Sequence, residues 1–234
     1  NRRTALMHAA ESSASPDVVW ALVAAGADVN AETQNGNTAL LYAIECSRNS
    51  ATAEDDWNWI YCWGDEDESD DGFLLTQVLP TDPSTDVIRV LIAGGADVNT
   101  RDADGRSPLI FAARLNCDLE VIKAIIAAGA DVNATDSFGF TALMEAVQHD
   151  GSPQAIETLI AAGAEVNAVD GEGRTPLMRA AATNPNPEVI RVLLALGADG
   201  KLRSYEGKTA FDYAEDNEAI RGTDVYWVLG DARS

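Results

Sequence analysis

The stretch Gly26-Ala-Asp-Val-Asn30 decides the fold of this chain, because it recurs at a fixed interval. Its copies are Gly95–Asn99, Gly129–Asn133, Gly163-Ala-Glu-Val-Asn167 and the altered Gly197-Ala-Asp-Gly-Lys201, at intervals of 69, 34, 34 and 34 residues. A second motif, first seen as Thr4-Ala-Leu6, keeps the same spacing through six copies. A period of about 34 residues is typical of stacked repeats, each of which buries its apolar face against its neighbours. One interval is longer than the others by 35 residues, which indicates an insertion.

Local signals inside one repeat predict two helices. The Thr or Ser of the second motif can cap a helix that starts with Pro or Ala, as in Thr175-Pro-Leu-Met-Arg-Ala-Ala181. A second start signal, such as Ser15-Pro16, Ser152-Pro153 or Asn186-Pro187, precedes apolar runs such as Glu188–Ala195. The glycine of each Gly-Ala-Asp motif follows the second helix, where a left-handed residue ends it. Short polar turn segments then lead to the next repeat.

These motifs, T-P-L-x-x-A-A, G-A-D-V-N and D-x-x-G in phase, resemble ankyrin repeats. The resemblance implies an all-α solenoid of about six helix-turn-helix units with short β-turn fingers. The units would be residues 1–33, 34–102, 103–136, 137–170, 171–204 and 205–234 of a single domain. The added residue of each period lies between the two helices, a style similar to bacterial ankyrin proteins. The last unit is degenerate and aromatic, and we expect it to cap the stack.

The family's usual first-helix histidine is absent from this chain. Its six positions hold Met7, Leu41, Ile110, Met144, Met178 and Asp212. A side-chain hydrogen bond that is usual in the family is therefore expected to be missing here.

Composition and charge limit the functions that the chain can have. With 234 residues and 46% hydrophobic content, the chain can bury a continuous core along an elongated array. No apolar run reaches the roughly 18–20 residues that span a bilayer, so we expect a soluble protein, cytoplasmic, periplasmic or secreted. Because the first unit begins abruptly at its helix, an upstream segment is also expected. The net charge of -22 disfavours nucleic acid and anionic membranes as ligands and favours a basic protein or a cation, with solubility as the alternative explanation.

The extra residues, 48–83, fall between the two helices of the second unit. They contain ten acidic residues against the single base Arg48. Aromatic side chains alternate at Trp57, Trp59, Tyr61 and Trp63, and a period of two predicts a strand. Paired with Phe73–Leu79, this strand would form a β-hairpin with an acidic tip; a flexible acidic lasso is the alternative. The tip carboxylates are Asp65, Glu66, Asp67, Glu68, Asp70 and Asp71. The aromatic residues either pack on the first three units as a lid or dock on a basic partner.

The resemblance also implies a binding surface, the concave groove formed by the turn tips and the exposed side of the first helices. The tip residues at these positions are Gln34, Asn35, Asn37, Arg101, Asp104, Arg106, Ser137, Phe138, Phe140, Glu172, Arg174, Tyr205, Glu206 and Lys208. The helix ends add Glu11, Glu45, Cys46, Arg114, Gln148 and His149. The aromatic residues at the tips would either anchor a partner or pack against the adjacent tip.

Catalytic and metal-binding patterns are weak. The two histidines, His8 and His149, belong to different units, and no nucleophile elbow, phosphate loop or Cys/His metal spacing is present. An EF-hand count from Asp67 fails at its twelfth position, which is Val78 instead of glutamate. We therefore expect no enzyme activity, cofactor or dedicated metal. Of the three cysteines, Cys46 and Cys62 could form a disulfide, or all three could be small buried hydrophobes.

The sequence thus predicts a non-enzymatic scaffold, expected to be monomeric, that binds a basic protein through the groove and the insertion. Two alternatives stay open. One is an inhibitor or immunity protein that blocks a toxin or a nucleic-acid-processing enzyme. The other is a divalent-cation-responsive adaptor.

Overall fold

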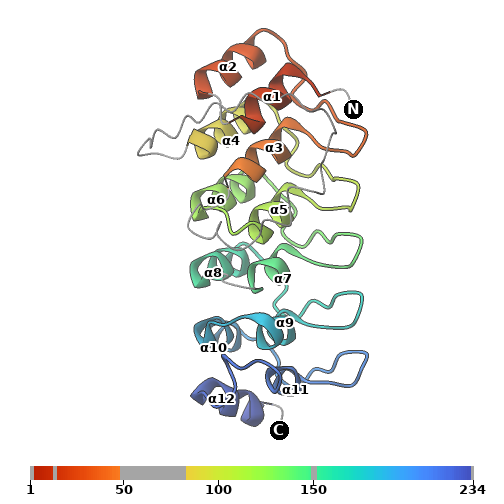
Figure 1. Ribbon diagram of the computed structural model, residues 1–234, viewed down its shortest axis with the longest axis vertical. Coiled ribbons are helices and arrows are strands. Elements are labelled where there is room, and N and C mark those ends of the chain that lie inside the picture. The colour runs from red at the N-terminus through yellow and green to blue at the C-terminus, as the bar shows by residue number, and fades with distance from the viewer. Residues whose placement is uncertain (1–2, 13–14, 48–82, 149–151, 233–234) are drawn as a thin grey trace, which may run out of the picture.

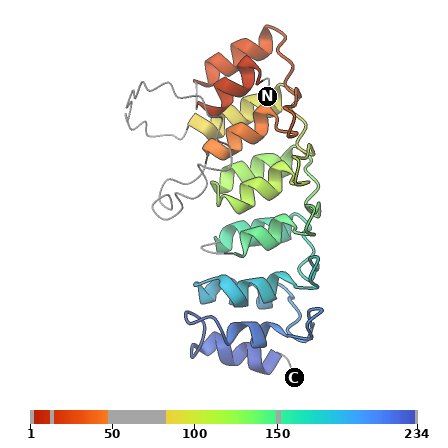
Figure 2. The ribbon, with the colours of Figure 1, turned by 45° about the vertical axis from the view of Figure 1, so that its right-hand side comes forward.

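A computed structural model describes residues 3–12, 15–47, 83–148 and 152–232. Within these residues the chain forms α1(Ala5–Glu11), α2(Pro16–Ala24), α3(Ala39–Cys46), α4(Pro83–Ala93), α5(Pro108–Arg114), α6(Leu119–Ala127), α7(Ala142–Ala146), α8(Pro153–Ala161), α9(Pro176–Thr183), α10(Pro187–Ala195), α11(Ala210–Ala214) and α12(Asp224–Ala232). Figure 1 shows these helices as antiparallel pairs stacked in one column, with the loops that join successive pairs on one side, and Figure 2 shows the same column turned. The predicted all-α repeat solenoid is confirmed.

Each odd-numbered helix, called an inner helix here, begins at the predicted cap. The hydroxyl of Thr4, Thr38, Ser107, Thr141, Thr175 or Thr209 accepts a hydrogen bond from the backbone N–H three residues later, at 3.2–3.5 Å. This bond satisfies one of the N–H groups that a helix start leaves unpaired. The second recurring motif of the sequence is therefore a series of helix caps.

The even-numbered, outer helices start less uniformly. Ser15 and Asn186 cap α2 and α10 as predicted. Ser152 lies at the predicted N-cap position of α8, but its hydroxyl makes no capping bond to the helix backbone; it donates to Gln154 Oε1 at 2.8 Å. After the insertion, α4 begins at Pro83, two residues earlier than the sequence pattern indicated, so Pro83 belongs to the helix.

The core runs along the column between neighbouring pairs. Inner helices pack on inner helices from α1 to α11, and outer helices pack on outer helices from α2 to α12. Leu40, Leu109, Leu143 and Leu177 are fully buried at equivalent positions of successive inner helices. Burial of such rows in every unit gives one continuous core.

The opening motif connects each repeat to the next. The amide of Asn133 donates to the Gly163 carbonyl at 3.0 Å, and its oxygen accepts from the Glu165 N–H at 2.9 Å. Asn30, Asn99 and Asn167 make the same two bonds to the following repeat. The motif glycines have φ between 88° and 100°, which glycine adopts without strain. The motif therefore ends one helix and joins two repeats.

The insertion lies outside the described residues, apart from Pro83. The predicted hairpin or lasso, its aromatic and acidic residues and the pairing of Cys62 stay predictions for the same reason. His149 also lies outside them.

Candidate protein-binding surface

The turn segments before the inner helices, residues 31–37, 100–106, 134–140, 168–174 and 202–208, are called fingers here. Backbone hydrogen bonds join the tip of each finger to the next tip. The N–H groups of Ala103, Ser137, Gly171 and Tyr205 donate to the carbonyl groups of Asn35, Asp104, Phe138 and Glu172, at 2.9–3.0 Å. The tips therefore form one continuous edge along the column.

An aspartate braces each of the three central fingers from inside. One oxygen of Asp136 accepts the N–H groups of Phe138 and Phe140, at 2.9 and 2.8 Å. Asp102 and Asp170 make the same pair of bonds within their own fingers. Such side-chain-to-backbone bonds fix the turn geometry. The tip side chains consequently project from a fixed backbone.

In the last four fingers, the tip position three residues before the helix cap carries three carboxylates and one aromatic ring. Asp104, Phe138, Glu172 and Glu206 lie at this position in successive fingers, and all four are exposed. Phe138 is 64% exposed, and its ring centroid lies 6.3 Å from that of Phe140. The row therefore combines three exposed carboxylates with one apolar group.

Tyr205 contacts the neighbouring finger and still faces solvent. It is 78% exposed. Its ring lies against Gly173, where an added Cβ would come within 2.6 Å of the ring. The two interpretations of this tyrosine, packing against the adjacent tip and exposure to a partner, therefore describe the same geometry.

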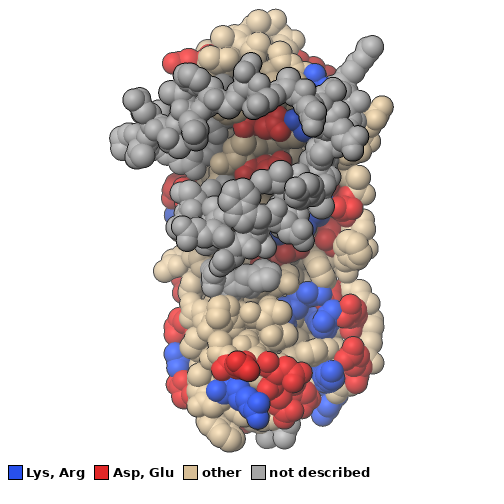
Figure 3. Space-filling view, in the orientation of Figure 1, with Lys and Arg blue, Asp and Glu red and all other residues tan. Residues whose placement is uncertain are grey.

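Three basic residues of the fingers, Arg106, Arg174 and Lys208, are paired with acids of the same finger. Arg106 contacts Asp102 at 3.0 Å and also Asp104. Arg174 contacts Asp170 at 3.6 Å and also Glu172, whereas Lys208 contacts Glu206 at 3.1 Å. That last bond raises the pKa of Lys208. Figure 3 shows basic and acidic side chains next to one another on the finger side of the lower half of the molecule.

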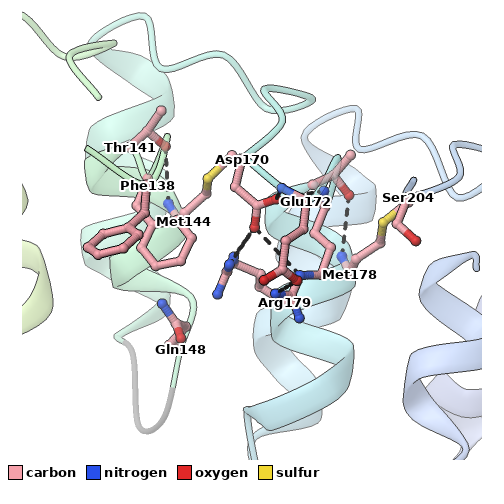
Figure 4. A network of polar contacts seen from close by, with 12 residues as sticks. Phe138, Thr141, Met144, Gln148, Asp170, Glu172, Met178, Arg179 and Ser204 are labelled. Carbon is pink, nitrogen blue, oxygen red and sulfur yellow. Dashed lines mark hydrogen bonds and ion pairs between the residues drawn. The ribbon is translucent and has the colours of Figure 1, made fainter. Parts of the chain in front are cut away.

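A buried ion pair connects one finger to the next inner helix. Arg179 of α9 donates through Nε to Asp170 Oδ2 at 2.7 Å, and Nη2 contacts the same oxygen. The guanidinium carbon also lies 3.7 Å from the ring centroid of Phe140, on the preceding finger. In Figure 4, Arg179 reaches toward Asp170 on the side of the stack where Phe138 and Gln148 also lie. Arg179 thus joins two units at the centre of the surface.

Sequence reasoning missed a row of inner-helix residues on the finger side. Phe111, Glu145, Arg179 and Tyr213 lie four residues after their caps, and each is partly exposed. The signal that could have found them is the 34-residue period, which places them at equivalent positions. Arg106 lies over the Phe111 ring at 5.1 Å and Lys208 over the Tyr213 ring at 5.5 Å. The row therefore forms contacts with the fingers.

Glu145 is the acid of this row. Burial raises the pKa of its carboxyl, and Asp136 adds to the increase, whereas Arg114, Arg179 and Arg106 oppose it. Gln148 Nε2 lies 3.4 Å from one of its oxygens. A partly desolvated carboxylate therefore lies among cations at the middle of the surface.

The other residues expected at the finger tips differ in how exposed they are. Ser137 and Gln34 are exposed at their tips. Arg101 lies on the flank of its finger, where Nη1 donates to the carbonyl groups of Gly105 and Thr135 at 2.9 and 2.6 Å. Asn37 is buried, so its expected place on the exposed surface is wrong. Its backbone closes the finger by bonding to the N–H and the hydroxyl of Thr33.

These features define a class: a solenoid of stacked helix pairs whose exposed face is built from braced turn segments and inner helices. The family comparison is more specific. The model described as "Ankyrin repeats (3 copies)" matches residues 1–54, 81–170 and 143–225, and the chain belongs to this family. A comparison with curated proteins finds no match.

The family assignment indicates a general function. Ankyrin repeats are scaffolds for protein–protein interaction and are typically not enzymes. In the described part of the chain, no three His, Cys, Asp or Glu side chains are grouped so that they could hold a metal ion. No helix there is long and apolar enough to cross a membrane.

Proposed function

We propose that this chain is a scaffold that recognises a basic protein partner through the finger tips and the exposed side of the inner helices, the concave groove expected from the sequence. The insertion, residues 48–83, would add a second contact surface. The observation that carries this proposal is the exposed row of Asp104, Phe138, Glu172 and Glu206 on a tip edge held by backbone bonds.

The exposed tip carboxylates favour a cationic partner, and each of them also contacts a base of its own finger. Arg106, Arg174 and Lys208 already contact carboxylates of their own fingers, so an acidic partner would have to compete for them. The tip carboxylates are exposed and keep oxygen lone pairs for further donors. Exposed ion pairs contribute only about 0–1 kcal/mol, so an incoming lysine or arginine can share a tip carboxylate at little cost.

The aromatic residues would supply the apolar part of the contact. Phe138 and Tyr205 project from braced tips, so ordering them on binding costs little conformational entropy. An aromatic ring beside carboxylates is a good complement for an arginine, which can stack on the ring and pair with the acid. We therefore propose Arg101, Asp104, Arg106, Ser137, Phe138, Phe140, His149, Arg174, Tyr205 and Lys208 as the contact set.

The test is affinity capture from native lysate, followed by measurement of Kd with the purified partner. The variant E172Q/E206Q removes two tip charges, and E157Q on outer helix α8 is its control. We expect the tip variant to weaken binding by about tenfold and E157Q to leave it unchanged. Affinity should also fall as salt rises. Equal affinity of the two variants, or affinity that does not depend on salt, would contradict an electrostatic tip contact.

Two further variants locate the contact along the chain. F138A/F140A tests the aromatic tip, and deletion of residues 50–81 tests the insertion. Loss of binding only in the deletion would assign recognition to the insertion, and loss only in the double substitution would assign it to the fingers. Retention by both would contradict both assignments.

The inhibitor or immunity alternative would use the same surface. It is distinguished by the captured partner: a toxin or nucleic-acid-processing enzyme whose activity falls when the chain is added. The cation-responsive alternative predicts instead that calcium raises Tm and that a chelator reverses the increase.

A further inference from the structure

Two of the three bracing aspartates have an arginine on their second carboxylate oxygen. Oδ2 of Asp102 accepts a hydrogen bond from Arg106 Nε at 3.0 Å. Oδ2 of Asp170 accepts one from Arg179 Nε at 2.7 Å. No hydrogen bond or ion pair reaches Oδ2 of Asp136 from the residues that the structure describes. The brace of the 134–140 finger therefore lacks the arginine that the other two have.

The sequence explains this difference, because Phe140 stands where the other two braced fingers have Arg106 and Arg174. Asp136 is only 9% exposed, and a charge that is so far removed from water is costly without a counter-ion. Its Oδ2 is still open to solvent, because Arg174 Nε is the one buried side-chain nitrogen or oxygen without a partner among the described residues. The finger thus has an accessible acceptor for a cation.

A second carboxylate and an exposed ring lie next to this acceptor. Glu145 of α7 is close enough to Asp136 for their charges to repel each other, and its carboxylate contacts Gln148 Nε2 at 3.4 Å. Phe138, which follows the brace by two residues, is exposed. Asp136, Phe138 and Glu145 together are called the arginine site here.

The arginines of the chain do not neutralise the two carboxylates of this site. Arg106 and Arg179 lie near Glu145, but each already binds the aspartate of its own finger. Burial and Asp136 raise the pKa of Glu145 although these arginines and Arg114 oppose the increase. A cation from outside would therefore stabilise both carboxylates.

The chain itself shows which group fits a ring next to a carboxylate. Arg179 lies with its guanidinium carbon 3.7 Å from the centroid of the Phe140 ring while it binds Asp170. Arg106 lies 5.1 Å from the centroid of the Phe111 ring while it binds the aspartate of its finger. A guanidinium can do both at once because it is planar and carries five N–H donors.

We propose that the arginine site binds one arginine side chain of the partner, with the ring of Phe138 against the guanidinium and with Asp136 Oδ2 and Glu145 accepting its N–H groups. The inference rests on the proposed function and names the group that the partner inserts at the centre of the surface. A lysine fits less well, because its compact ammonium cannot lie flat on a ring and pair with two carboxylates.

The test uses a probe that does not depend on the identity of the partner. The full chain is titrated in NMR experiments with N-acetyl-arginine methylamide, and separately with N-acetyl-citrulline methylamide, which has nearly the same shape without the charge. We expect the arginine probe to shift the Phe138 ring resonances along a saturable curve, with a Kd of about 1–10 mM. The citrulline probe should give no saturable shift.

Matched variants separate the site from the net charge of the chain. D136N and E145Q should each raise the Kd of the arginine probe by about fivefold or more. E157Q removes one exposed charge from α8 and should leave the Kd unchanged. Circular dichroism checks that all three variants keep their helical signal. A linear shift, equal binding of the citrulline probe, or equal Kd values in the three variants would overturn the inference.

Failure of this inference can be told from failure of the proposed function. If E172Q/E206Q weakens binding of the captured partner and D136N and E145Q do not, the tip contact stands and the arginine site is wrong. If D136N and E145Q weaken partner binding and E172Q/E206Q does not, the arginine site stands and the tip contact is wrong. We expect both sets of variants to weaken it, and the same loss when one arginine of the partner is replaced by lysine.

Discussion

The buried ion pair between Asp170 and Arg179 allows a quantitative test of how the central fingers are held. The Asp170 side chain is 0% exposed and that of Arg179 is 10% exposed. One oxygen of Asp170 accepts the N–H groups of Glu172 and Arg174, at 2.8 and 2.9 Å, and the other accepts from Arg179. The substitution D170N can keep the first oxygen as an acceptor. It places a neutral amide next to Arg179, which then lies mostly buried without its anion.

The expected loss follows from that burial. Breaking a buried pair by changing one partner costs about 3–5 kcal/mol, because the remaining charge is desolvated and uncompensated. The Phe140 ring stays 3.7 Å from the guanidinium carbon and retains about 0.5–2 kcal/mol of cation–π attraction. We therefore expect D170N to lower the free energy of unfolding by about 3 kcal/mol, near the lower end of that range.

The control is D136N on the neighbouring finger. Asp136 makes the same two bonds to its finger backbone, but no ion pair reaches its carboxylate in the described part of the chain. We expect D136N to change the free energy of unfolding by less than about 1 kcal/mol. The double variant D170N/R179M should recover at least half of the D170N loss, because it leaves no unpaired buried charge.

Urea denaturation followed by far-ultraviolet circular dichroism measures these differences, and the slope m must be the same in all variants. Thermal unfolding should show D170N lower in Tm by about 6–12 °C, at about 2–4 °C for each kcal/mol. Similar losses in D170N and D136N would refute the reasoning. So would a double variant less stable than D170N.

Three other outcomes are expected. Gly173 and Gly207 have similar left-handed φ values of 73° and 78°, so G173A and G207A should each lower the free energy of unfolding by about 1 kcal/mol. Only G173A should shift the Tyr205 ring resonances in NMR spectra, and equal shifts in the two variants would contradict the Tyr205–Gly173 contact. Burial raises the pKa of Glu145 in the folded state, so the folded chain keeps this proton to a higher pH than the unfolded chain does. The free energy of unfolding should therefore fall as pH rises from about 4.5 toward the raised pKa and stay lower above it. E145Q should remove this pH dependence in urea titrations at several pH values. N133A removes two bonds between repeats and should lower the free energy of unfolding by about 1–2 kcal/mol in the same assay, and an unchanged value would show that the ladder contributes nothing.

Most of the architecture could be predicted because it depends on signals that are local and repeated. A cap such as Thr141 needs only its own hydroxyl and the Met144 N–H three residues later, which a sequence displays directly. Gly163 ends α8 through its own φ of 100°. The predicted start of α8 at Ser152 and Pro153 is correct, but the expected capping bond from the Ser152 hydroxyl is absent, and that hydroxyl donates to Gln154 Oε1. Whether the hydroxyl also accepts a backbone N–H depends on its side-chain orientation, which a motif does not encode.

The candidate surface was predicted less completely, because its contacts cross between units. Phe140 and Arg179 are 39 residues apart and meet only when consecutive units stack in register. Asn37 belongs to a tip by its position in the sequence, yet it is buried in the folded chain. The pairing of Arg106 and Arg174 with acids of their own fingers also changes the charge that a partner would meet. Position in a repeat predicts where a residue lies, but not which neighbours neutralise it.

The division between backbone and side chains explains how one fold can present different binding surfaces. The tip edge is joined by N–H and carbonyl groups at Ala103, Ser137, Gly171 and Tyr205, and these bonds are the same for a methyl group, a hydroxyl, no side chain or a phenol. Selection on the tip side chains is therefore nearly independent of the stability of the edge. One exception is Gly173, because its missing side chain leaves the space in which the Tyr205 ring lies. At that finger, the requirement of the fold for a left-handed glycine and the placement of an exposed aromatic ring depend on the same residue.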